Sequence, residues 1–127
     1  MSEPQDIRDR TLDYALRAVR LYRAVQGGDD RAGWIIGKQY LRAATSIGAN
    51  VAEAQAAESP ADFIHKYSLA QKEAREGLYW LRLFDRSGII AAERLGDLIG
   101  ETEEIIAIIT TILVRAKAAR AERAGNA

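Results

Sequence analysis

Gly37-Lys-Gln-Tyr-Leu-Arg-Ala-Ala-Thr-Ser-Ile-Gly-Ala-Asn-Val-Ala-Glu-Ala-Gln-Ala-Ala57 is the stretch that decides the fold. Its core candidates recur at alternating spacings of 4 and 3, the period of a helix that packs along its length against other helices. These positions are Ile36, Tyr40, Ala43, Ile47, Asn50, Ala54 and Ala57. We therefore expect a long helix that carries one amide, Asn50, on its apolar stripe.

A buried amide that finds no hydrogen-bond partner costs about 1–3 kcal/mol. Such a residue commonly fixes the register or the number of packed helices instead of adding stability. Ser46 and Glu53 lie about one turn on either side of Asn50. We predict that Ser46, Asn50 and Glu53 together determine helix register.

Helical periods also precede and follow this stretch, with no strand signal between them. The expected helices cover residues 5–26, 31–57, 60–86 and 92–119 of a single domain, 1–127. Ser59 and Pro60 predict the start of the third helix, and Gly88 predicts its end. The apolar face expected for the first helix comprises Leu12, Ala15, Leu16, Val19, Tyr22 and Val25. The fold class is therefore all-α, an antiparallel up-down-up-down four-helix bundle.

The fourth helix has the strongest apolar stripe: Leu95, Leu98, Thr102, Ile105, Ile109, Ile112 and Ala116. Further apolar residues, including Ile108 and Val114, widen this stripe beyond what one bundle seam needs. Part of the helix is therefore expected to face another subunit. Trp80 and Ile108 are the candidate positions in this oligomer interface.

The composition argues against most catalytic sites. The chain has no cysteine and one histidine, His65, with no glutamate three residues before it, so neither a di-iron bundle site nor a Cys-His pair is expected. Glu53, Glu73 and Glu76 are expected to form salt bridges with Arg42, Lys72 and Arg75 instead of acting as acid and base. We expect no enzyme, no metal, no cofactor and no small-molecule substrate. The polar N-terminus and the lack of a long apolar run favour a cytoplasmic protein without a membrane partner.

Local charge matters more than net charge here, because Lys plus Arg and Asp plus Glu both number 18. In an antiparallel bundle, four arginines would gather near one end: Arg17, Arg20, Arg23 and Arg31. At the other end, where the first helix begins, the fourth helix supplies Arg115, Lys117, Arg120 and Arg123 as candidate nucleic-acid contacts. Repetition around a ring would strengthen such weak contacts. The alternative is a solvated charge run that matches its helix dipole.

Several blocks of this sequence resemble a known family. They are Gly37-Lys38-Gln39, Leu41-Arg42, Thr45 to Ala54, Asp62 to Lys66, Lys72 to Glu76 and Leu78-Tyr79-Trp80-Leu81. Residues 7 to 116 look like the bacterial four-helix bundle family of the protein encoded in intervening sequences of 23S rRNA genes. The accessory protein of diversity-generating retroelements is related to it. In two respects the chain departs from that pattern: its net charge is zero, and Gly77 stands where the family more often has a small hydroxyl residue.

The resemblance implies a ring-like homopentamer without catalytic residues, and, for the retroelement member, binding to nucleic acid and to a reverse transcriptase. We therefore expect a non-enzymatic oligomeric scaffold or binding module associated with RNA, DNA or a nucleic-acid enzyme. The alternative is an accessory subunit that contacts only a protein, such as a reverse transcriptase.

Overall fold

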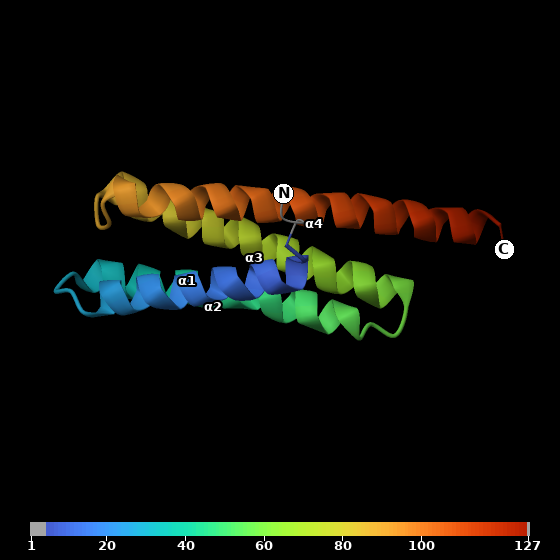
Figure 1. Cartoon of the computed structure of the whole chain (residues 1–127), viewed down its shortest axis with the longest axis horizontal. Helices are drawn as coiled ribbons and strands as arrows, with labels where there is room; N and C mark the ends of the chain where they lie inside the picture. The colour runs from blue at the N-terminus through green and yellow to red at the C-terminus, as the bar shows by residue number, and fades with distance from the viewer. Residues whose placement is uncertain (1–4, 127) are drawn as a thin grey trace.

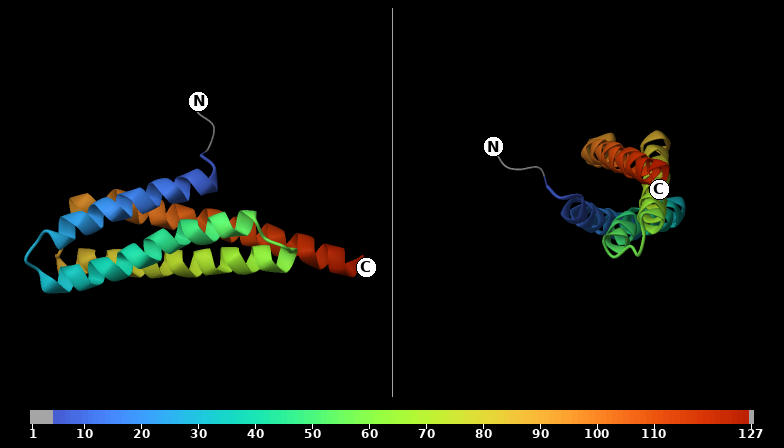
Figure 2. Two further views of the ribbon diagram at one scale, coloured as in Figure 1. Left: turned by 90° about the horizontal axis from the view of Figure 1, so that it is seen from below. Right: turned by 90° about the vertical axis from the view of Figure 1, so that its right-hand side faces the viewer.

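The computed structural model describes residues 5–126 and contains four helices. They are α1 (Ile7–Gln26), α2 (Arg31–Gln55), α3 (Pro60–Ser87) and α4 (Ala92–Gly125). Within residues 5–126 there is no strand. The chain turns back at each of three short connections, so that consecutive helices lie side by side (Figures 1 and 2). The prediction of an all-α fold with four helices is confirmed.

Local residues explain where α2 and α3 begin and where α3 ends. Asp30 accepts a hydrogen bond from the Gly33 amide at the start of α2, and Ser59 accepts one from the Asp62 amide at the start of α3. These bonds satisfy amides that would otherwise lack a partner in the first helical turn. At the end of α3, Gly88 has φ 73°, a left-handed conformation that favours glycine. The predicted start and end of the third helix are confirmed.

The core runs along the seam between α2 and α3, which is the most extensive contact between any two helices. On α3 the residues that face the core, Tyr67, Ala70, Ala74, Gly77, Leu81 and Phe84, are buried, while Phe63 is half-buried. On α2, Val51 is fully buried and Asn50 is only half-buried, so the valine fills the core position that the heptad count assigned to the amide. α4 rests mainly on α3 and contacts α1 much less.

The apolar face predicted for the first helix is wrong at Leu12 and Leu16, whereas Val25 packs against the core as predicted. Leu12 and Leu16 are 62% and 48% exposed, whereas Thr11, Tyr14 and Ala18 are the buried residues of α1. The prediction counted aliphatic residues and overlooked hydroxyl residues whose polar groups are satisfied inside the protein. Thr11, for example, donates a hydrogen bond to the carbonyl of Ile7 at 2.8 Å. A core position on a helix can therefore be polar when its hydroxyl has a partner.

A chain of buried hydroxyl groups connects three helices. Tyr40 of α2 donates to the Tyr14 hydroxyl of α1 at 2.9 Å, and the Tyr14 oxygen lies 2.6 Å from the Thr102 oxygen of α4. Because Thr102 donates its proton to the carbonyl of Leu98 at 2.7 Å, Tyr14 is the donor toward Thr102. Burial raises the pKa of both tyrosines, so their hydroxyls remain protonated. This chain fixes how α1 sits between α2 and α4.

α4 is longer than predicted and ends at Gly125 instead of Ala119. Its last turns are rich in alanine, arginine and lysine, which are strong helix formers, so the helix continues without tertiary support. α4 extends past the connection between α2 and α3, whereas α1 begins only about halfway along the length of α4 (Figure 1). The final turns of α4 therefore project from the bundle.

Candidate functional site

The three residues predicted to determine register lie along one side of α2. Asn50 donates to the carbonyl of Ser46 at 2.9 Å, and the Ser46 hydroxyl donates to the carbonyl of Arg42 at 2.7 Å. Ser46 and Asn50 are half-buried, and Glu53 is exposed. Within the described residues these side-chain bonds stay inside α2 and join no second helix. The role of Ser46, Asn50 and Glu53 in register stays a prediction.

One turn before Ser46, Arg42 connects α2 to α3. Its guanidinium lies 2.6 Å from Glu76 and 3.3 Å from Glu73. The Glu73 oxygen is buried and makes this ion pair without a hydrogen bond of normal geometry. The hydrogen bond from Arg42 lowers the pKa of the Glu76 carboxyl, which also accepts from the indole of Trp80 at 3.3 Å. The expected pairing of Glu73 and Glu76 with Arg42 is confirmed, whereas Lys72 and Arg75 form no ion pair among residues 5–126.

The candidate interface residues lie at the surface of α3 and α4. Trp80 and Ile108 are half-buried, and the ring of Tyr79 stands edge-on to that of Trp80 with centroids 5.0 Å apart. Tyr79 and Val114 are 60% and 62% exposed. This leaves apolar area on α3 and α4 available to a partner. Whether a second subunit covers it stays a prediction.

Sequence analysis missed a second apolar surface, on α1 and α2. Leu12 borders a hollow of about 190 Å³ together with Ala15 of α1 and Gly48, Ala49 and Ala52 of α2. Leu16 lies one turn from Leu12 and is also largely exposed. A leucine pair next to small residues on the neighbouring helix is a signal that the sequence contained. The sequence pattern places Leu12 and Leu16 in the core because it omits Tyr14, which lies on the buried face of α1.

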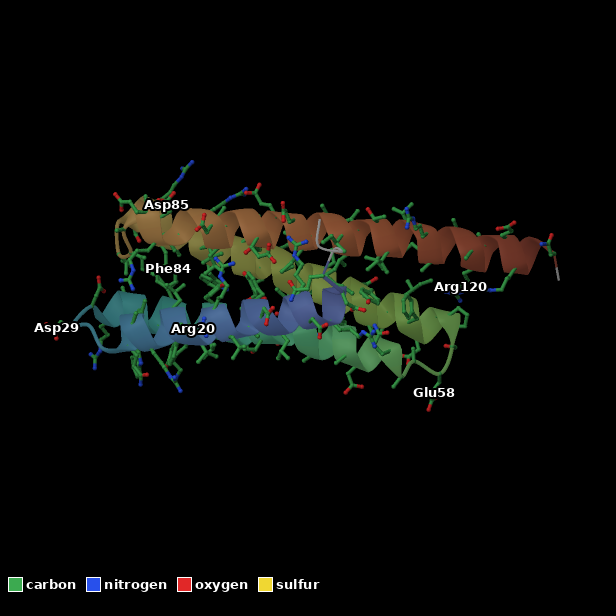
Figure 3. The ribbon with its side chains drawn as sticks, in the orientation of Figure 1. Arg20, Asp29, Glu58, Phe84, Asp85 and Arg120 are labelled. Carbon is green, nitrogen blue, oxygen red and sulfur yellow. The ribbon has the colours of Figure 1, made fainter. Side chains whose placement is uncertain are left out.

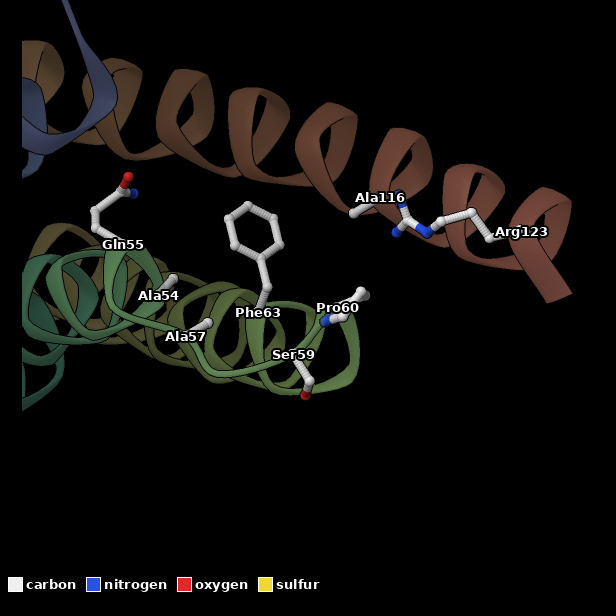
Figure 4. Close-up of a pocket in the computed structure, with 8 residues that line it drawn as sticks. All are labelled: Ala54, Gln55, Ala57, Ser59, Pro60, Phe63, Ala116 and Arg123. Atoms are coloured by element: carbon white, nitrogen blue, oxygen red, sulfur yellow. The ribbon is translucent and has the colours of Figure 1, made fainter.

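The four candidate nucleic-acid contacts lie on the last part of α4. Arg115, Lys117, Arg120 and Arg123 are all exposed, and none forms an ion pair within residues 5–126. Arg123 extends back along α4 toward Ala116 and faces Phe63 and Pro60 across a hollow of about 390 Å³ (Figure 4). The basic end of α4 therefore lies beside the connection between α2 and α3, beyond the point where α1 begins.

The other arginines fall into a different arrangement from the one expected. Arg17 and Arg20 of α1 line a hollow of about 270 Å³ with Arg94 of α4, whereas Arg23 and Arg31 do not line it. Arg20 and Arg120 lie in opposite halves of the molecule (Figure 3). The spacing of Arg17 and Arg20 is visible in the sequence, but their approach to Arg94 depends on how α1 and α4 are aligned in space. Sequence analysis therefore missed Arg94.

Residues 5–126 contain neither a metal-binding cluster nor a helix able to span a membrane. No group of three or more His, Cys, Asp or Glu residues among residues 5–126 is placed to hold a metal ion. Across the same residues, each helix is too short or too polar to cross a bilayer.

Comparison with known proteins connects this geometry to a family. The sequence matches the family model of the 23S rRNA-intervening sequence protein over residues 6–111. A similar solved structure is a Bacteroides thetaiotaomicron protein of unknown function from the S23 ribosomal protein family. It is 38% identical, with a TM-score of 0.79 over 85% of this chain and 98% of that chain. No curated protein matches the sequence. The chain belongs to the 23S rRNA-intervening sequence protein family.

Proposed function

We propose that this protein is a non-enzymatic, homo-oligomeric helical scaffold that binds nucleic acid through the basic end of α4. The observation that carries the proposal is the set of exposed basic side chains on the projecting end of α4, represented by Arg120 (Figure 3), none of which forms an ion pair within residues 5–126. The oligomer is an antiparallel up-down-up-down protomer repeated in a ring-like homopentamer. Each subunit adds one basic α4 end to this ring.

Repetition would allow the four exposed cations of a neutral chain to hold a nucleic acid. A single cluster of four positive charges binds a nucleic acid weakly at physiological salt. When several basic α4 ends are held at fixed spacing, binding of one end makes binding of the next ends to the same nucleic acid intramolecular. Overall affinity then rises without new types of contact. The family match ends at residue 111, so the basic end of α4 lies beyond the matched segment. Nucleic-acid binding would then be a property of this chain's own extension.

The test is binding of unspecific RNA and single-stranded DNA at two salt concentrations. We compare the unmodified protein with a variant in which Arg115, Lys117, Arg120 and Arg123 are all replaced by Gln. We expect binding that weakens with salt and is lost in the variant, because removal of the cations also removes counterion release. Absence of binding at low salt, or binding that ignores both salt and the four substitutions, would rule out this role.

A protein-only role is the second candidate, and the exposed apolar surfaces favour it. Leu12 and Leu16 on α1 and Tyr79 on α3 can bury apolar area against a partner without any contribution from charge. A protein whose mass shows an oligomer but which binds neither RNA nor DNA would match this role. Its partner would then be a protein, such as a nucleic-acid enzyme.

A further inference from the structure

The hollow between α1 and α4 brings together three arginines from two helices. Arg17 and Arg20 lie one turn apart on α1, and Arg94 approaches from the first turn of α4. Among residues 5–126 none of the three forms an ion pair with a carboxylate. Asp97, one turn along α4 from Arg94, does not line the hollow and forms no ion pair either. Three like charges that converge without a counterion repel one another, so an anion between them would be stabilised.

Another arginine at the contact between α1 and α4 forms ion pairs that join the two helices. About two turns before Arg17, Arg10 of α1 donates two hydrogen bonds of 2.7 Å to Glu101 of α4 and also contacts Glu104. These bonds raise the pKa of Arg10. α1 and α4 are thus joined by a complete ion-pair network at one point. Farther along the contact between α1 and α4, Arg17, Arg20 and Arg94 line the hollow, and no carboxylate lines it with them.

The hollow also has apolar residues in its lining. Its floor contains Leu21, which is half-buried, and Leu98, which is 4% exposed. Arg17 is half-buried and close enough for its charge to act on the hydroxyls of Tyr14 and Tyr40 below it. Arg17 therefore lies near the contact between α1 and α4, while Arg20 and Arg94 are exposed at the rim of the hollow. A guanidinium is a planar fork of donors and can form paired hydrogen bonds to two oxygens of one phosphate.

We infer that Arg17, Arg20 and Arg94 form a binding site for a phosphate group, whose carrier covers Leu21 and Leu98. A free nucleotide and the backbone of a nucleic acid both present this group. The apolar floor favours a ligand in which the phosphate is attached to a less polar part. The site is separate from the basic end of α4 and does not depend on the proposed function.

The experiment measures binding of pyrophosphate to the unmodified protein by calorimetry at low salt. Arg20→Gln and Arg94→Gln remove one guanidinium each, and Arg94→Lys keeps the charge but removes the forked donor geometry. Arg86→Gln, at an exposed arginine near the end of α3, is the matched control. Circular dichroism checks that every variant keeps its helices. We expect each Gln substitution to raise the pyrophosphate Kd at least about tenfold, Arg94→Lys to have a smaller effect, and Arg86→Gln to have none.

Two competition arms identify the source of the phosphate. In one arm, short single-stranded RNA competes with pyrophosphate for the variant that lacks Arg115, Lys117, Arg120 and Arg123. If the RNA displaces pyrophosphate, the site binds a nucleic-acid backbone. Displacement by ATP but not by this RNA assigns it to a free nucleotide. No pyrophosphate binding, or binding that Arg20→Gln and Arg94→Gln leave unchanged, overturns the inference. Binding of a hexaglutamate peptide with none of pyrophosphate would overturn it in favour of an acidic protein segment.

Discussion

Glycines inside these helices differ in the space that surrounds them. A Cβ added at Gly77 of α3 would lie 3.7 Å from Tyr40 and 3.8 Å from the Tyr14 hydroxyl, which are ordinary contacts. One added at Gly33 of α2 would lie 2.9 Å from a methyl group of Ile89, which is too close. At Gly96 of α4 it would meet nothing within 4 Å. Alanine substitutions at these three positions therefore distinguish the effect of helix propensity on stability from the effect of packing.

We predict that Gly77→Ala raises the free energy of unfolding by about 0.5–1 kcal/mol, because alanine favours the helix and fits the available space. Gly96→Ala is the control and should give the propensity gain alone. Gly33→Ala should lose that gain or destabilise the protein, since Ile89 is branched at Cβ and must shift to make room. Urea unfolding of the three variants measures these differences. A destabilised Gly77→Ala would show that α3 packs against the tyrosines more tightly than these distances allow.

At the scale of the element, α1 depends on one hydroxyl group. Tyr14→Phe would leave the donor of Tyr40 buried without its acceptor, at a cost of about 1–3 kcal/mol in the free energy of unfolding. The double variant Tyr14→Phe/Tyr40→Phe should recover part of this loss, because both members of the hydrogen bond are then absent. Thermal and urea unfolding measure both variants. A neutral Tyr14→Phe would mean that packing, and not this hydroxyl chain, positions α1.

The same chain of hydroxyls shows what the sequence could and could not predict about the elements. Caps such as Ser59 and Gly88 act on their own helix end, so the boundaries of α3 could be predicted. Most of the α4 stripe could be predicted because aliphatic residues define it, with Thr102 as the one hydroxyl residue among its buried positions. The face of α1 could not, because Tyr14 is buried with hydroxyl partners on α2 and α4, and Thr11 is buried with its hydroxyl bonded to a carbonyl of its own helix. A count of apolar residues includes neither of these hydroxyl residues.

At the scale of the whole molecule, prediction from sequence is limited by the alignment of helices in space. Sequence analysis found the charges of the α4 end, because those residues are neighbours along one helix. It missed the arginine hollow, because Arg94 and Arg20 meet only when α1 and α4 are placed beside each other. It also placed Asn50 in the core, one position from the buried Val51, because a 4-3 count tolerates a shift of one residue at the edge of the stripe.

A closed ring requires two different surfaces on each subunit that fit each other. This protomer has two apolar candidates: Leu12 with Leu16 on α1, and a surface on α3 and α4 to which Tyr79, Trp80 and Ile108 contribute. If these surfaces meet head to tail, a charge in either one breaks every contact of the ring. We therefore predict that the unmodified protein is an oligomer at micromolar concentration, and that Leu12→Glu and Ile108→Glu each lower its mass.

Light scattering measures these masses, with Ala24→Glu as the control because Ala24 is exposed on α1 away from Leu12 and Leu16. A carboxylate desolvated in an apolar interface costs several kcal/mol, enough to dissociate a ring whose contacts are individually modest. A monomeric mass for the unmodified protein would contradict the oligomer. An intact oligomer in Ile108→Glu together with a dissociated Leu12→Glu would confine the interface to α1 and α2, and two such identical surfaces would favour a two-fold dimer over a ring.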